Sequence, residues 1–155
     1  MEAKKYLLQH SQYENRIRRN NSIIRSRRRM ISEAMESAAS VQAIDYSKSR
    51  VQTSPKDAML EKVANFIDKG NKVYAEIQEL IEENQRLIAE CQLIVRQIQD
   101  IGREEYADIL MGRYVDRLSF QAIAHNMRYS YSRVTHMHGE ALQVFEEKYI
   151  KVSNE

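Results

Sequence analysis

Residues that bend or end helices are scarce in this sequence. Its 155 residues include one proline and four glycines, and tryptophan is absent. Glycine and proline are the residues least compatible with a helix interior, so their scarcity removes the usual obstacles to long helices. The rest of the sequence is rich in residues that lose little side-chain freedom in a helix, such as Lys, Arg, Glu, Gln, Met and Leu. The composition therefore predicts an all-α fold.

Cysteine is almost missing, and long apolar runs are missing altogether. Cys91 is the single cysteine, which excludes an intrachain disulfide and fits a reducing compartment. No apolar run approaches the ~20 residues that a membrane-spanning helix needs. Tyr6, Leu7 and Leu8 behind the N-terminal lysines are too few for the core of a signal peptide. We expect a cytoplasmic protein with no membrane partner.

The sequence also lacks the patterns of an active site. There is no glycine-rich phosphate loop and no plausible Cys and His pair, so we expect no enzyme, no catalytic residues and no cofactor. His136 and His138 are two residues apart, and such residues point in different directions on a helix. With no second pair of ligands, we expect no metal site.

Charge is unevenly distributed although the formal net charge is only +2. Residues 16–29 contain no acid and hold a run of arginines: Arg16, Arg18, Arg19, Arg25, Arg27, Arg28 and Arg29. This arginine run has three candidate roles: contacts to DNA phosphates, ion pairs with glutamates of a second helix, and binding of an acidic protein partner.

Two heptad seams predict two long helices in residues 1–101. From Met59 to Ile101, residues recur at alternating spacings of three and four, and a weaker seam runs through residues 3–39. Such a stripe is buried when another helix lies along it. We expect a linker at about residues 41–55, ending at Pro55. An antiparallel hairpin and a homodimer, or a higher homo-oligomer, would each bury the seams; the breadth of the second stripe favours an oligomer with both kinds of contact.

Asn84 lies within the second seam. A buried amide there would fix the register or the number of helices, because it demands a polar partner. The alternative is a seam that is open to water at this point. Both interpretations are compatible with the sequence.

Three shorter amphipathic helices are predicted in residues 103–150. The first contains Tyr106, and the second and third begin after Ser119 and Ser130, which are good N-caps. On the third helix one set of residues shares an apolar side: Val134, Met137, Ala141, Leu142 and Phe145. Small Ala124 would let the second and third helices approach closely. A short helix, a turn of three or four residues and a helix with a polar first turn are what a helix-turn-helix requires.

The end of the chain resembles a known family. Residues 118–142, LSFQAIAHNMRYSYSRVTHMHGEAL, resemble the region-four helix-turn-helix of bacterial sigma factors without a gap, and EYADILMGRYVDR resembles the preceding helix. The whole arrangement is similar to phage and prophage transcription regulators, the ArpU-like and RinA-like late-gene activators and a related streptococcal phage family. For the first 100 residues the similarity is one of architecture.

The resemblance implies a sequence-specific regulator of transcription that binds double-stranded DNA. The matching positions for DNA contact are Arg128, Tyr131, Ser132, Arg133, Thr135 and His136. Arg128 replaces the usual glycine of the turn, and Tyr131, Thr135 and His136 stand where the family has arginines and a glutamine, so we expect the family's base preference to be lost or altered. Activation is expected over repression, with RNA polymerase as a further candidate partner. The alternative is a coiled-coil interaction module that binds host RNA polymerase or another phage protein without reading DNA.

Overall fold

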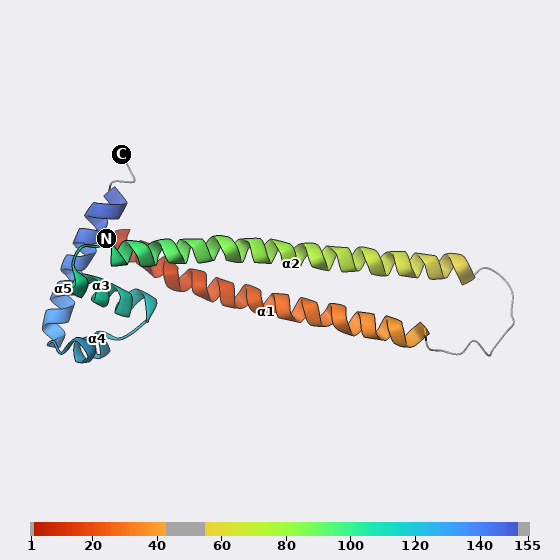
Figure 1. Ribbon diagram of the computed structural model, residues 1–155, viewed down its shortest axis with the longest axis horizontal. Helices are drawn as coiled ribbons and strands as arrows, with labels where there is room; N and C mark the ends of the chain where they lie inside the picture. The colour runs from red at the N-terminus through yellow and green to blue at the C-terminus, as the bar shows by residue number, and fades with distance from the viewer. Residues whose placement is uncertain (1, 43–54, 152–155) are drawn as a thin grey trace. The chain divides into compact units, whose positions relative to one another are not determined.

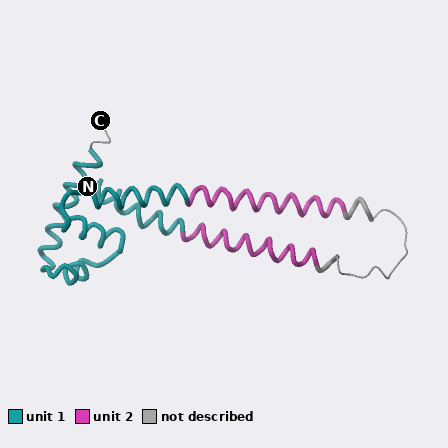
Figure 2. The backbone as a smooth tube through the Cα atoms, viewed as in Figure 1, with its two compact units in different colours: residues 1–17, 85–155 teal, residues 18–84 magenta. Residues whose placement is uncertain are grey.

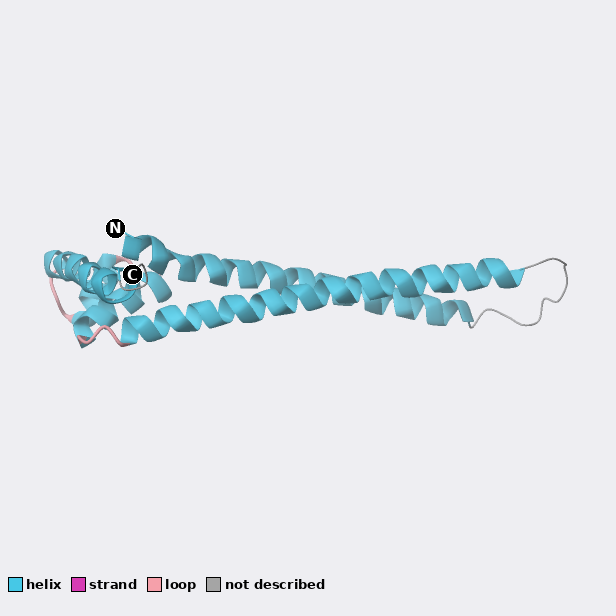
Figure 3. Cartoon of the chain, turned by 90° about the horizontal axis from the view of Figure 1, so that it is seen from above, coloured by secondary structure: helices cyan, strands magenta, loops and turns pink. Residues whose placement is uncertain are grey.

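In the part of the chain that the structure describes, every regular element is helical and there is no strand; short loops join the helices (Figures 1 and 3). This computed structural model describes the backbone of residues 2–42 and 55–151 and the side chains of residues 2–39 and 60–151. Its elements are α1 (Glu2–Gln42), α2 (Pro55–Gln99), α3 (Glu104–Leu110), the π-helical turn η1 (Met111–Val115), α4 (Phe120–Met127), α5 (Tyr131–Phe145) and the π-helical turn η2 (Glu146–Lys151). The all-α prediction is confirmed. None of the described helices is long and apolar enough to cross a membrane.

The chain divides into two compact units (Figure 2). Unit 1 comprises Met1–Ile17 and Gln85–Glu155, and unit 2 comprises Arg18–Asn84. The sequence suggested a boundary between residues 1–101 and 103–150, but the ends of both long helices belong to unit 1. Most of the predicted linker at 41–55, namely residues 43–54, lies outside the described part of the chain.

Unit 1 has one apolar core, to which both long helices contribute. Ala3 and Leu7 of α1 are fully buried, as are Ile94 and Ile98 of α2. They share a cluster with buried side chains of the C-terminal helices: Tyr106, Ile109, Leu110, Tyr114, Ile123, Ala124, Val134, Met137, Ala141, Leu142 and Phe145. The start of α1 and the end of α2 therefore pack into the core of the C-terminal helices, which the heptad pattern alone did not predict.

A glycine permits close packing in the middle of unit 1. Gly112 of η1 is buried, and a Cβ atom placed there would lie 3.1 Å from Cγ1 of Ile123 on α4. Contact that close is tighter than ordinary packing tolerates without movement. Gly112 thus sets how near η1 and α4 approach.

In unit 2, α1 and α2 run antiparallel and pair through buried amides. Asn84 is 7% exposed; its Oδ1 accepts from Nδ2 of Asn20 at 3.0 Å, and its Nδ2 donates to Oδ1 of Asn21 at 2.9 Å. Asn20 also donates to Glu83 at 2.9 Å. The water-exposed interpretation of Asn84 is wrong. The amide cluster of Asn20, Asn21 and Asn84 fixes the register of α1 against α2 within the chain.

The second seam is only partly covered by α1. Ile77 is 5% exposed, whereas Val63 and Phe66 are 48% and 42% exposed. Of the residues that broaden the stripe, Ile67 and Tyr74 are 54% and 53% exposed. Met59 belongs to the seam but its side chain lies outside the described residues. Unit 2 therefore presents apolar side chains that α1 does not cover.

Candidate nucleic-acid interface

Two serine-capped helices meet at a short turn in unit 1. Oγ of Ser119 accepts from the backbone N–H of Ala122 at 3.2 Å, and Oγ of Ser130 accepts from that of Arg133 at 3.2 Å. Each cap satisfies an N–H that the first turn of a helix would otherwise leave unpaired. Residues 128–130 separate α4 from α5, which confirms the predicted starts of both helices and the predicted length of the turn.

Arg128 gives the turn its direction. It has φ 56° and ψ 39°, the left-handed conformation in which helices commonly end, usually at glycine. Its N–H donates to the carbonyl of His125, and that of Tyr129 donates to the carbonyl of Ala124 at 2.9 Å. The sigma factors that this segment resembles usually have glycine at this position, where this chain has arginine. The backbone nevertheless adopts the conformation that glycine favours.

One side of α5 is buried and the other is open. The five residues predicted for the apolar side are all buried in the core of unit 1: Val134, Met137, Ala141, Leu142 and Phe145. On α4, Ile123 and Ala124 are buried while Phe120 and Met127 are half-buried. The apolar side predicted for α5 is therefore buried, and small Ala124 lies buried on α4.

Five of the six predicted DNA-contacting residues are exposed around the start of α5: Arg128, Tyr131, Ser132, Arg133 and His136. Thr135 differs, because it is half-buried and its hydroxyl donates to the carbonyl of Ser132 at 2.9 Å. Its donor is therefore already used within the helix.

Two neighbours that the sequence analysis did not single out position these residues. The guanidinium of Arg133 lies 3.9 Å from the ring centroid of Tyr129, a cation–π contact. Nε2 of His136 lies 3.4 Å from Oε1 of Glu140 and pairs with it when the imidazole is protonated. His136 and Glu140 are four residues apart on α5, a spacing that places side chains together on a helix, whereas Tyr129 lies in the turn before α5.

Glu140 is itself anchored to α3. The hydroxyl of Tyr106 donates to Oε2 of Glu140 at 2.8 Å and accepts from Arg103 at 2.7 Å. The hydrogen bond to Glu140 and burial raise the pKa of Tyr106, so the phenol remains the donor. Through Glu140, the orientation of His136 depends on a helix outside the α4–α5 pair.

The predicted arginine run lies mostly in unit 2. Arg16 belongs to unit 1 and the other six belong to unit 2. Nε of Arg27 lies 3.2 Å from Glu76 in an ion pair without hydrogen-bond alignment, and Arg29 pairs with Glu33 on its own helix at 2.8 Å. Arg27 thus takes the predicted ion-pairing role. Exposed members of the run remain on α1: Arg18, Arg19, Arg25 and Arg28.

The polar groups at the exposed start of α5 are mainly hydrogen-bond donors. In the described part of the chain, no three His, Cys, Asp or Glu side chains come together as a metal site. The exposed start of α5 instead offers guanidinium, imidazole and hydroxyl groups, which are donors suited to phosphates and base edges. The chain matches no family model, no curated protein and no solved structure.

Proposed function

We infer that this chain binds double-stranded DNA through a helix-turn-helix formed by α4 and α5, and that it regulates transcription as a phage or prophage late-gene activator. The observation that supports this function is the geometry at Arg128. Two serine-capped helices are joined there by a three-residue turn, with the apolar side of the second helix buried and its polar start exposed. A reading helix needs that division of its surface.

Base contacts are assigned to the first two turns of α5. Arg133 presents a planar fork of donors that matches O6 and N7 of guanine, and His136 and Ser132 add shorter-range donors or acceptors. Arg128, at the turn, lies where a phosphate contact would fix the approach of α5 to the groove. Because Thr135 uses its hydroxyl within the helix, its methyl group is the part available for contact with a thymine methyl.

Unit 2 supports a role in assembly. Most of the large apolar side chains that are exposed in the described part of the chain lie in this unit: Ile23, Met30, Met35, Leu60, Val63, Phe66, Ile67 and Tyr74. Apolar surface of that extent marks an interaction site. A second copy is the proposed occupant, since a dimer would present two reading helices to two half-sites. The exposed arginines of α1 would then add sequence-independent attraction to phosphates.

Substitutions at Arg133 separate reading of bases from general attraction to DNA. Arg133→Lys keeps the positive charge but loses the planar fork, so binding to a preferred site should fall about tenfold or more while binding to unrelated DNA stays nearly unchanged. Arg96→Ala, at an exposed arginine near the end of α2, is the control and should leave both affinities unchanged.

Gel-shift titrations of phage promoter fragments at two salt concentrations provide the measurement. Equal loss of affinity for all sequences in Arg133→Lys would contradict base reading by this residue. If no fragment is retarded even at low salt, the chain is an interaction module that binds another protein instead of DNA.

A further inference from the structure

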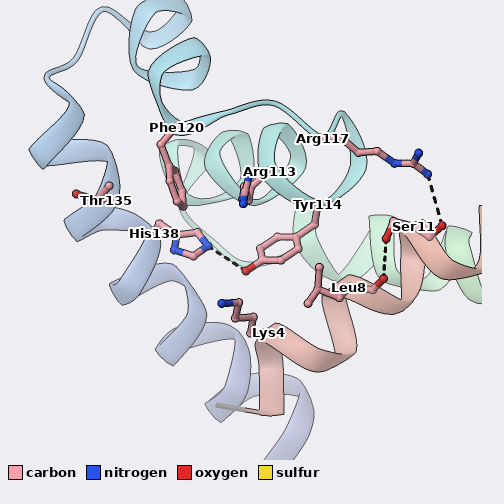
Figure 4. Close-up of a pocket in the computed structure, with 9 residues that line it drawn as sticks. All are labelled: Lys4, Leu8, Ser11, Arg113, Tyr114, Arg117, Phe120, Thr135 and His138. Carbon is pink, nitrogen blue, oxygen red and sulfur yellow. Dashed lines mark hydrogen bonds between the residues drawn. The ribbon is translucent and has the colours of Figure 1, made fainter.

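Behind the exposed side of α5, unit 1 contains a cavity of about 480 Å³ (Figure 4). Its lining comes from α1, η1 and the segment after it, α4 and α5: Lys4, Leu8, Ser11, Arg113, Tyr114, Arg117, Phe120, Thr135 and His138. The volume lies within the range of small-molecule sites, roughly 300–1,000 Å³.

The charged side chains that line this cavity are all basic. Lys4, Arg113 and Arg117 contribute to the wall, and no carboxylate does. Arg117 is balanced from outside the wall, because its Nη2 donates to Oε2 of Glu14 at 2.6 Å. Lys4 has no hydrogen bond or ion pair with another described residue, and Arg113 donates only to the carbonyl of Leu118 at 3.0 Å. Two cations are therefore left without a counter-charge at one cavity.

Polar and apolar groups occupy distinct parts of the wall. The hydroxyl of Tyr114 and Nε2 of His138 are 3.0 Å apart, and Figure 4 shows both facing the ammonium of Lys4. The ring of Phe120 lies edge-on to that of His138, with 4.9 Å between the two centroids. The guanidinium of Arg113 lies 4.9 Å from the centroid of the Phe120 ring. Aromatic rings beside an uncompensated positive charge suit a ligand with a flat apolar part and an anionic group.

His138 lies close enough to both cations for their charges to act on its imidazole. Burial, followed by the charges of Arg113 and Lys4, lowers the pKa of its imidazole below the ordinary value of 6.5. A neutral imidazole both donates and accepts one hydrogen bond, so it can complete a polar contact without adding a further charge.

We propose that this cavity binds a small organic anion with an aromatic or other apolar portion, its phosphate or carboxylate lying between Lys4 and Arg113. The ligand would contact His138 and Thr135, both on α5. If α5 reads DNA, which rests on the proposed function, occupancy would bias the position of the reading helix and so couple the ligand to DNA affinity. Binding itself does not depend on that function.

Phenyl phosphate is a suitable probe, titrated into the full-length chain by calorimetry and by the imidazole NMR signals of His138. Saturable binding is expected, with weaker binding of inorganic phosphate, which lacks the ring, and of phenol, which lacks the anion. Benzoate distinguishes a carboxylate site from a phosphate site. Lys4→Gln should weaken phenyl phosphate binding about tenfold or more, because a charge-assisted contact is lost.

Lys5→Gln is the matched control, since Lys5 is an exposed neighbour that does not line the cavity. It should change the affinity less than about twofold, the residual effect expected of a screened surface charge. Equal weakening by both variants, or no saturable binding of phenyl phosphate or benzoate at millimolar concentration, would overturn the proposal. If Lys4→Gln lowers only DNA affinity and neither anion binds, the cations serve the DNA backbone and the ligand site is refuted.

Discussion

Replacing Arg128 separates the backbone of the turn from the chemistry of its side chain. The residue has φ 56°, a conformation in which the Cβ atom of an L-residue is crowded. That crowding costs roughly 1–2 kcal/mol, and glycine avoids it. Against this, glycine gives the unfolded chain more freedom, which lowers stability by about 0.4–1 kcal/mol. The net effect favours glycine.

We therefore expect Arg128→Gly to be more stable than Arg128→Ala by roughly 0.8 kcal/mol, the difference between the midpoints of these two effects. Alanine is the right reference because it removes the same guanidinium and keeps the Cβ atom. Urea unfolding followed by circular dichroism, at one protein concentration, gives the two free energies of unfolding.

DNA binding, unlike stability, should not distinguish the two variants. Both variants lack the cation, so if Arg128 contacts a phosphate, both should bind all DNA sequences more weakly and to the same extent, with a flatter dependence on salt. A glycine variant no more stable than the alanine variant would refute the left-handed turn on which the α4–α5 geometry depends. Unchanged affinity in both would remove Arg128 from the interface.

Two further substitutions test unit 2 and the cavity. Asn84→Ala should destabilise the chain by about 1–3 kcal/mol in urea unfolding, because it removes the buried hydrogen-bond partner of Asn20. The control is Asn71→Ala, at an exposed asparagine of α2. Equal destabilisation by both would contradict a structural role for the amide cluster. Because burial and the charge of Arg113 lower the pKa of folded His138, the unfolded chain takes up a proton first as the pH falls below about 6.5. The free energy of unfolding should therefore decrease as the pH falls below about 6.5, and His138→Gln should flatten that decrease. An identical pH dependence of both proteins would refute the lowered pKa of His138.

Periodicity in the sequence was sufficient to predict the helices and their buried sides. Local rules govern these features: a spacing of three and four selects one side of a helix, and a serine before an apolar run caps its start. The buried side of α5 and the caps at Ser119 and Ser130 followed from these rules. The seam pattern located Asn84 but left open whether it is buried, which only the amide cluster with Asn20 shows.

The remaining features depend on contacts between segments that are far apart in the sequence. Leu7 is buried because the C-terminal helices cover the start of α1, and no local pattern shows that. The left-handed backbone at Arg128 and at Arg117, where φ is 58°, goes against the usual preference of arginine. The cavity beside Lys4 likewise arises only when α1 meets η1, α4 and α5.

The side-chain neighbours of the candidate interface are an intermediate case. Glu140 follows His136 by four residues on α5, a spacing that was visible in the sequence, whereas Tyr129 reaches Arg133 from the turn before α5. What the sequence did not contain is the link from Glu140 to Tyr106 on α3, which makes the position of His136 depend on the fold of unit 1.

Selection of bound fragments from a random pool of double-stranded DNA by the full-length chain tests the central claim most directly. The account predicts enrichment of one sequence pattern with two-fold symmetry, its half-sites separated by whole turns of the double helix, about 10 base pairs each. Arg133→Lys should lose preference at specific positions of that pattern. Recovery of a pool with no sequence enrichment, at low and at moderate salt alike, would contradict the assignment of α5 as a reading helix.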